Sequence, residues 1–137
     1  MSALRLTLTF DGGSRGNPGP AYGSYLLQSR DPRLEPRRLV RLDFGRGTNN
    51  EAEYWTLLAG LREIQSALQR RSVPLGEVEL MVVGDSQLVL RQVAGEWKLK
   101  DARMRDLCGD ARELLEPFGR VVLRHQPRSR IVRQLGH

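Results

Sequence analysis

The sequence is poor in the residues that cross-link small secreted proteins or bind soft metals. Its single cysteine, Cys108, excludes an internal disulfide and a thiolate cluster. No run approaches the roughly 18 to 20 apolar residues that are needed to cross a membrane. The first ten residues contain no apolar segment followed by a small-residue cleavage site, so we expect no signal peptide. We therefore expect a cytoplasmic protein with no membrane partner.

The length of 137 residues favours a single domain over residues 1–137 that buries a core without structural metals. The net charge of +6 is unevenly distributed, because residues 120–137 contain five arginines and no acid. This basic segment favours an anionic partner, and a solvated tail is the alternative. No feature of the sequence points to a protein partner.

Alternating apolar and polar residues predict three strands, at 4–10, 22–30 and 39–44. The short breaks between them favour an antiparallel meander. A long helix then follows over 51–70, with Thr48 or Asn50 as its N-cap. Its predicted buried stripe consists of Ala52, Trp55, Leu58, Ala59, Leu61, Ile64 and Leu68.

The second half predicts a strand at 78–83, helices at 86–93 and 103–115, and a last strand at 121–123. This order of elements indicates an α/β fold. We expect a five-stranded mixed sheet, in which the three-stranded antiparallel meander is joined by parallel strands and flanked by helices.

Acidic residues follow the first and fourth predicted strands, as Asp11 and Asp85, and Glu53 lies on the first turn of the long helix. Ligands of α/β sheets bind at the carboxyl ends of the strands. If the two strands are parallel neighbours, Asp11 and Asp85 meet there, and the helix N-terminus brings Glu53 to the same point. Taken singly, the three also fit a routine turn, an N-cap and a surface acid.

Three carboxylates packed together raise one another's pKa unless a cation compensates their charge. Oxygen ligands without histidine or cysteine favour Mg²⁺ or Mn²⁺ over zinc. The glycine-rich stretch after Asp11 matches neither of two common phosphate-binding motifs, since it lacks the lysine of a P-loop and the spacing of a dinucleotide fingerprint. It predicts an ordered loop that approaches a ligand closely, with Arg15 and Asn17 as polar contacts.

Three motifs in order, DGGSRGNPGPAYG, TNNEAEYWTLLAGL and GDSQLVLRQVAGEWKLK, resemble type 1 ribonuclease H in its compact bacterial and archaeal form. The resemblance covers about residues 4–125. It implies a ribonuclease H-like fold and hydrolysis of the RNA strand of RNA–DNA hybrids, leaving a 5′-phosphate. It also implies two Mg²⁺ or Mn²⁺ ions held by Asp11, Glu53 and Asp85, with Glu51 as the rival of Glu53.

The resemblance further implies contacts with the hybrid. The RNA strand and its 2′-hydroxyls would meet the turn after Asp11, the TNN segment and the start of the second helix, and the GEWKLK segment would follow the DNA strand. The implied nucleic-acid-binding residues are Gly12, Gly13, Ser14, Arg15, Asn17, Thr48, Asn49, Asn50, Ser86, Gln87, Trp97, Lys98 and Lys100.

The C-terminus departs from the family. An H-x-P-R segment is present at residues 125–128, but Leu135 stands where the family has its fourth acidic ligand, and no acid follows Glu116. We expect a truncated or atypical last helix. The chain is then a piece of a longer protein, a binding-only relative, or an enzyme in which His137, through its imidazole or a terminal carboxylate, fills the fourth place.

His125 matches a family histidine that helps water or product to leave, and a strand-end histidine without a role is the alternative. Two functions follow from these observations. The first is a metal-dependent endonuclease acting on RNA–DNA hybrids, with a preference for Mn²⁺. The second is a catalytically impaired module that binds hybrid or double-stranded nucleic acid.

Overall fold

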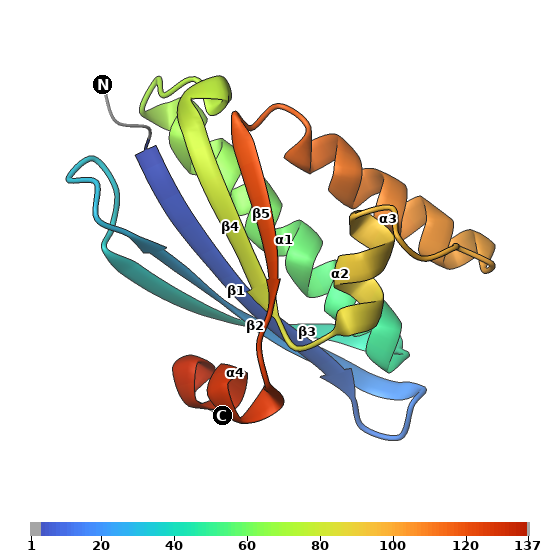
Figure 1. Ribbon diagram of the computed structural model, residues 1–137. Coiled ribbons are helices and arrows are strands. Elements are labelled where there is room, and N and C mark those ends of the chain that lie inside the picture. Colours follow the sequence, from blue (N-terminus) through green and yellow to red (C-terminus); the bar gives the residue numbers. More distant parts are fainter. Residues whose placement is uncertain (1–3, 137) are drawn as a thin grey trace.

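The computed structural model describes residues 4–136. One mixed sheet has the strand order β3-β2-β1-β4-β5 (Figure 1). Its strands are β1 (Leu4–Ser14), β2 (Gly19–Ser29), β3 (Arg37–Gly47), β4 (Val78–Gly84) and β5 (Arg120–His125). The first three form the antiparallel meander, and β4 runs parallel to both β1 and β5. The predicted α/β class and the five-stranded mixed sheet are confirmed.

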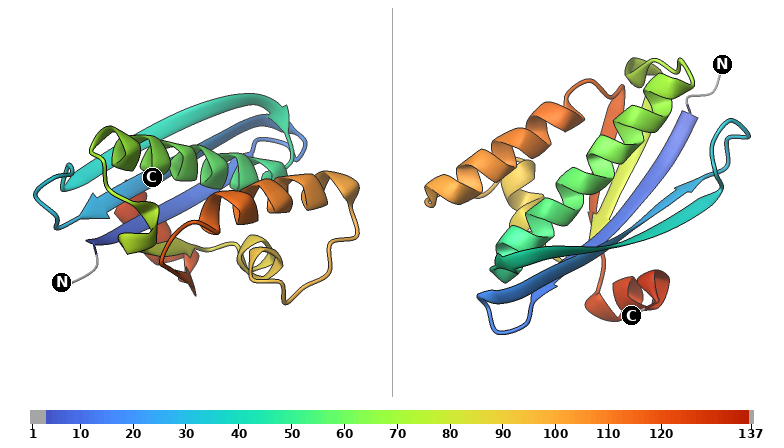
Figure 2. Two further views of the ribbon diagram at one scale, coloured as in Figure 1. Left: turned by 90° about the horizontal axis from the view of Figure 1, so that it is seen from above. Right: turned by 180° about the vertical axis from the view of Figure 1, so that it is seen from behind.

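Helices cover the two faces of the sheet unequally (Figure 2). One face carries α1 (Asn49–Arg70), α2 (Gln87–Val93) and α3 (Ala102–Leu115), and a single 3-10 turn, Leu75–Glu77, precedes β4. Among the residues that the structure describes, the opposite face carries only α4 (Arg128–Leu135), which is eight residues long. Within residues 4–136, none of the helices has the length and apolar character that a bilayer span requires.

The first strand is longer than the sequence pattern predicted. Asp11 pairs with Ser24, and Gly12 and Gly13 also pair across to β2, so the predicted strand end at Phe10 is wrong. The glycines mark a close approach of two backbones. A Cβ atom on Gly12 would lie 2.5 Å from the carbonyl carbon of Ala52 in α1. Glycine at this position therefore lets β1 pass directly against the first turns of α1.

The buried face of α1 is wider than the predicted stripe. Tyr54 and Leu57 are fully buried, whereas the predicted stripe residues Trp55 and Ala59 are only half-buried. The reason is that α1 packs against the sheet and against α3, where Gln65 Nε2 donates to the Leu114 carbonyl at 2.7 Å. A single apolar stripe assumes that the helix packs against one partner, so it wrongly predicts which residues of α1 are buried.

A small second cluster fixes α4 to its face of the sheet. Ile131 and Leu135 are fully buried against Leu26 of β2 and Val83 of β4. Arg41 of β3 closes the C-terminal end of the helix by donating to the Leu135 carbonyl at 3.2 Å. Apolar burial therefore orients α4, although the helix is short.

We expect Leu135→Ala to lower the free energy of unfolding by about 2–4 kcal/mol, because it removes buried methyl groups and leaves a cavity. Urea denaturation measures the change, and Val132→Ala on the half-buried side of the same helix is the matched control, with an expected loss below about 1 kcal/mol. Equal losses for the two variants would contradict the observed docking of α4.

Candidate active site

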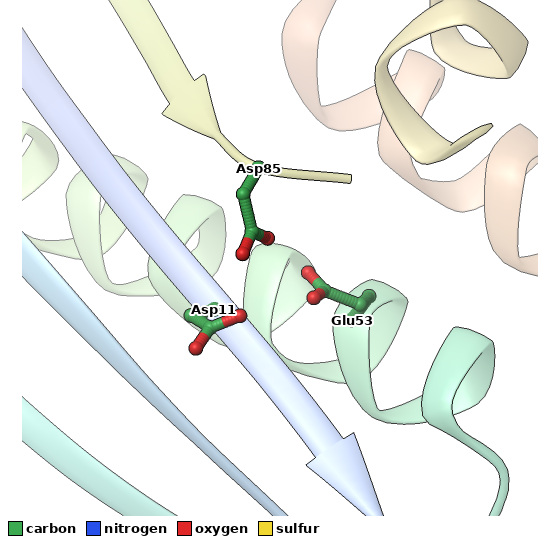
Figure 3. A group of neighbouring side chains, drawn as sticks. All are labelled: Asp11, Glu53 and Asp85. Atoms are coloured by element: carbon green, nitrogen blue, oxygen red, sulfur yellow. The ribbon is translucent and has the colours of Figure 1, made fainter. Parts of the chain in front are cut away.

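Three carboxylates from three elements converge at one end of the sheet (Figure 3). Thr9 and Val83 are partners in the parallel pairing of β1 with β4, so Asp11 and Asp85, two residues further along each chain, emerge at the same edge. Glu53 reaches this point from the first turns of α1. Ligand oxygens of Asp11, Glu53 and Asp85 all lie within 4.8 Å of one another.

Burial makes this acidic cluster costly in its charged form. Asp11 is 4% exposed and Glu53 is 7% exposed. Burial, followed by the charges of Asp11 and Asp85, raises the pKa of Glu53 well above its usual value, and a hydrogen bond from the Gly12 backbone opposes this. Burial and the Asp11 charge likewise raise the pKa of Asp85, which the Arg128 cation opposes. The protein therefore concentrates acidic groups whose charge is offset only in part, by Arg128 beside Asp85.

The hydrogen bonding of the cluster is also incomplete. Among the described residues, Oδ1 of Asp11 and Oε2 of Glu53 are buried and have no hydrogen-bond partner. Buried carboxylate oxygens are normally paired or coordinate a metal. An all-oxygen set of this kind fits Mg²⁺ or Mn²⁺, so the residues present suit the predicted metal.

The structure separates Glu53 from its rival Glu51. Oε1 of Glu51 accepts from the Thr48 backbone at 3.0 Å and completes a capping box at the start of α1. Its Oε2 accepts from Arg103 Nε of α3 at 3.0 Å. Glu51 therefore organises the helix N-terminus, while Glu53, two residues on, joins the acidic cluster.

The comparisons with known proteins agree with this geometry. The reverse transcriptase-like family matches residues 41–133. Ribonuclease HI of Halobacterium salinarum is 38% identical over 125 residues, which cover 91% of this chain and 58% of that protein. A bifunctional protein of Mycobacterium tuberculosis is 37% identical over 130 residues, which cover 93% of this chain and 32% of that protein. The chain thus spans between about a third and somewhat over half the length of these curated relatives.

Solved structures match along nearly the whole chain. The crystal structure of RNase H1 from Halobacterium salinarum has a TM-score of 0.77 at 37% identity, covering 94% of this chain and 90% of that chain. LC11-RNase H1 in complex with an RNA/DNA hybrid has a TM-score of 0.78 at 29% identity, covering 93% of this chain and 89% of that chain.

This chain is a ribonuclease H-like domain of the reverse transcriptase-like family. The resemblance drawn from its three sequence motifs is confirmed, as is the ribonuclease H fold.

Two basic side chains of this ribonuclease H-like domain lie beside the cluster. Arg128 Nη1 is 3.7 Å from Asp85 Oδ2, and His125 Nε2 lies 3.2 Å from the Asp85 backbone carbonyl. His125 is thus near the acids but exposed to solvent. No role for Arg128 was predicted from the sequence, although its place in the H-x-P-R segment after β5 was a usable signal.

The predicted RNA-binding segments of the domain lie side by side. The Ser14 amide donates to Asn49 Oδ1 at 2.7 Å, and the Asn49 amide donates to Asn17 Oδ1 at 3.0 Å. These bonds tie the β1–β2 turn to the start of α1. Each asparagine uses its side-chain oxygen here, which leaves its amide NH₂ group to donate elsewhere. Arg15 on the same turn stacks over Tyr22 at 5.5 Å.

The other predicted contacts follow β4. Ser86 caps α2 by accepting from the Val89 amide at 3.3 Å, and Gln87 at the first position of this helix is exposed. Between α2 and α3, Trp97 is 43% exposed and Arg91 lies 5.6 Å from the centre of its ring. Lys98 and Lys100 in the same segment are exposed.

The remaining predicted contacts lie around the β1–β2 turn and the start of α1. Thr48 is the N-cap of α1, and the adjacent Asn50 is exposed. The Gly12 backbone donates to Glu53, and Gly13 lies against Tyr22, where a Cβ would be 2.8 Å from the hydroxyl oxygen. All these nucleic-acid contacts stay predictions.

No fourth acid joins the cluster within residues 4–136. Leu135, which the resemblance places at the family's fourth ligand position, is fully buried among apolar residues and anchors α4. His137, the predicted replacement, lies outside the described residues, so its role stays a prediction.

We expect Glu53→Gln to raise the free energy of unfolding of the EDTA-treated protein at pH 8 by on the order of 1 kcal/mol. Folding raises the pKa of Glu53, so the folded state holds this proton more tightly and loses stability as the pH rises above the ordinary value of 4.5. The gain should therefore vanish at pH 4, where the carboxyl is protonated in both states.

Urea denaturation at the two pH values measures the difference. Glu113→Gln, at an exposed acid of α3, is the matched control and should show no gain. A Glu53→Gln protein that is less stable than the wild type at pH 8 would show that the carboxylate is not under electrostatic strain.

Proposed function

We propose that this domain is a metal-dependent endonuclease that hydrolyses the RNA strand of RNA–DNA hybrids and leaves a 5′-phosphate. The observation that carries the proposal is the buried cluster of Asp11, Glu53 and Asp85, in which two carboxylate oxygens lack any partner in the described part of the chain. The similarity to LC11-RNase H1, which was solved with an RNA/DNA hybrid, supports this substrate class.

Asp11, Glu53 and Asp85 would hold two divalent ions, Mg²⁺ or Mn²⁺. When bound, the ions supply activation of the attacking water and neutralise charge on the departing 3′ oxygen. The three side chains come from β1, α1 and the end of β4, so the packing of the core sets their spacing. Their burial excludes competing solvent and strengthens the attraction for cations.

The tied β1–β2 turn and α1 N-terminus would select RNA. Asn17 and Asn49 have free NH₂ donors after their oxygens have accepted backbone amides. Such donors suit the phosphate oxygens and the 2′-hydroxyls that distinguish RNA from DNA. The neighbouring Arg15 adds positive charge. This surface would hold the RNA strand next to the acidic cluster.

The segment between α2 and α3 would contact the DNA strand. Trp97, Lys98 and Lys100 are exposed on it, and Arg91 lies over the indole ring. Exposed cations bind phosphates irrespective of base sequence, and an exposed aromatic ring can pack against a sugar or base. The expected recognition is therefore independent of base sequence.

One observation favours the alternative of a binding module with impaired catalysis. Leu135 occupies the place of the fourth acid and its side chain is committed to the apolar core beneath α4.

The predicted use of His137 as a substitute ligand favours Mn²⁺, which accepts imidazole more readily than Mg²⁺ does.

We expect cleavage of a labelled RNA–DNA hybrid in either metal, faster with Mn²⁺ than with Mg²⁺, because three acids and the RNA-binding surface are intact. Asp11→Asn and Asp85→Asn should each lower the rate at least about 100-fold, since each removes a charged ligand. Gel-resolved cleavage kinetics measure the rates.

Asp106→Asn, at an exposed acid of α3, is the control and should cleave like the wild type. If the protein bound the hybrid but did not cleave it with either metal, the endonuclease proposal would be wrong and the binding module would be favoured.

A further inference from the structure

The face of the sheet beneath α4 concentrates exposed arginines. Side chains alternate along each strand, and Leu26 and Val83 mark this face because they pack against α4. Arg5 and Arg37 lie on it by the same alternation, as do Arg120 and Arg124 of β5. We call these four residues, together with Arg130 and Arg133 of α4, the basic face; all six are exposed.

Little negative charge opposes the basic face. Glu79 of β4 pairs with Arg5 at 3.3 Å and with Arg120 at 3.5 Å, and the side chains of these arginines remain 83% and 71% exposed. The other four arginines have no carboxylate within 4.0 Å in the described part of the chain. The six arginines outnumber the acids near them, which are Glu79, the exposed Asp43 of β3, and Asp31 of the loop after β2, which pairs with Arg33 at 2.9 Å.

The open part of this face is hollowed. In the sheet, Arg37 lies opposite Gln28, and Gln28 lies opposite Thr7. This row of side chains is next to the row of Leu26, which α4 covers. A hollow of about 870 Å³ lies here, lined by Arg5, Thr7 and Gln28 and by the loop after β2. Its lining is mixed, because Leu4, Pro32 and Pro36 lie beside the polar residues and Arg30 lies beside Asp31, and no aromatic ring of residues 4–136 lines it. Figure 2 shows α4 alone on this side of the sheet.

The hollow is remote from the acidic cluster. Arg5 and Glu79 pair at the N-terminal ends of β1 and β4, whereas Asp11 and Asp85 lie at the C-terminal ends. Six residues separate Arg5 from Asp11 along β1, a distance of roughly 20 Å. A ligand in the hollow would therefore not be held by the catalytic carboxylates.

We propose that the basic face is a second nucleic-acid surface, which binds the phosphate backbone of a duplex. Arg37 and Arg120 lie on the two outer strands, four strand spacings or roughly 19 Å apart. Cations spread over that width can contact phosphates on both strands across a major groove of about 12 Å. A single strand would need stacking rings to hold its bases, and none lines the hollow.

Binding of a labelled DNA duplex to the full chain in EDTA tests this proposal. Fluorescence anisotropy over a range of salt concentrations compares the wild type with the double variant Arg37→Gln and Arg120→Gln. Glutamine removes the positive charge and keeps a polar side chain. Glu79 loses Arg120 in this variant but still pairs with Arg5. We expect at least about a tenfold loss of affinity at 50 mM salt, and a salt slope smaller by about 1.8.

The matched control is Arg62→Gln with Arg70→Gln, which removes two exposed charges from α1. It should change the affinity less than about twofold. An equal loss of duplex affinity in the two double variants would show that net charge alone causes the effect and would contradict the proposal. Unchanged affinity in the Arg37→Gln and Arg120→Gln variant would also overturn it. Retained duplex binding with loss of polyglutamate binding would indicate an acidic protein partner instead.

Cleavage of a short RNA–DNA hybrid separates this surface from the catalytic groove. Both double variants should keep the wild-type rate and melting temperature. A normally folded Arg37→Gln and Arg120→Gln protein that no longer cleaved would place these arginines in the catalytic groove and contradict a second surface. Because duplex binding is read without cleavage, its outcome is independent of the proposed enzymatic activity.

Discussion

The close contact between β1 and the first turns of α1 is the constraint on which the rest of the site depends. Only glycine fits at position 12, where any Cβ would collide with the backbone of Ala52. This contact brings Asp11 and Glu53 together in a place where neither is solvated. The parallel pairing of β1 with β4 then adds Asp85 to the same point. The fold thereby holds carboxylates in mutual repulsion, which a bound divalent cation would relieve.

The surroundings preserve that arrangement without neutralising it. The capping box uses Glu51 and not Glu53, and the asparagine bonds tie the β1–β2 turn to the start of α1. Arg128 approaches only the outermost acid, Asp85, from the opposite face of the sheet. The inner carboxylates therefore stay available for metal, while hydrogen bonds between rigid elements fix the β1–β2 turn beside them. The residues that stabilise the local structure, such as Glu51 and the two asparagines, are therefore different from the carboxylates that repel one another.

Much of this could be predicted from residue types and their order. Alternation located the first three strands, short apolar runs located the last two, and acids after neighbouring strands predicted the meeting of Asp11 with Asp85. The errors have a common cause, since local patterns do not reveal tertiary packing. Gly12 signals a loop in isolation but a close backbone approach in the fold. Likewise, the fully buried Tyr54 lies outside the predicted stripe of α1, and the contact of Arg128 with Asp85 depends on where α4 docks on the sheet.

Anomalous diffraction from crystals soaked in Mn²⁺ would locate a cation in the acidic cluster without any assay of activity. We expect a Mn²⁺ peak among the carboxylates of Asp11, Glu53 and Asp85, bound to the oxygens that lack protein partners in the described residues. Well-ordered carboxylates with no Mn²⁺ peak between them at millimolar metal would contradict this expectation.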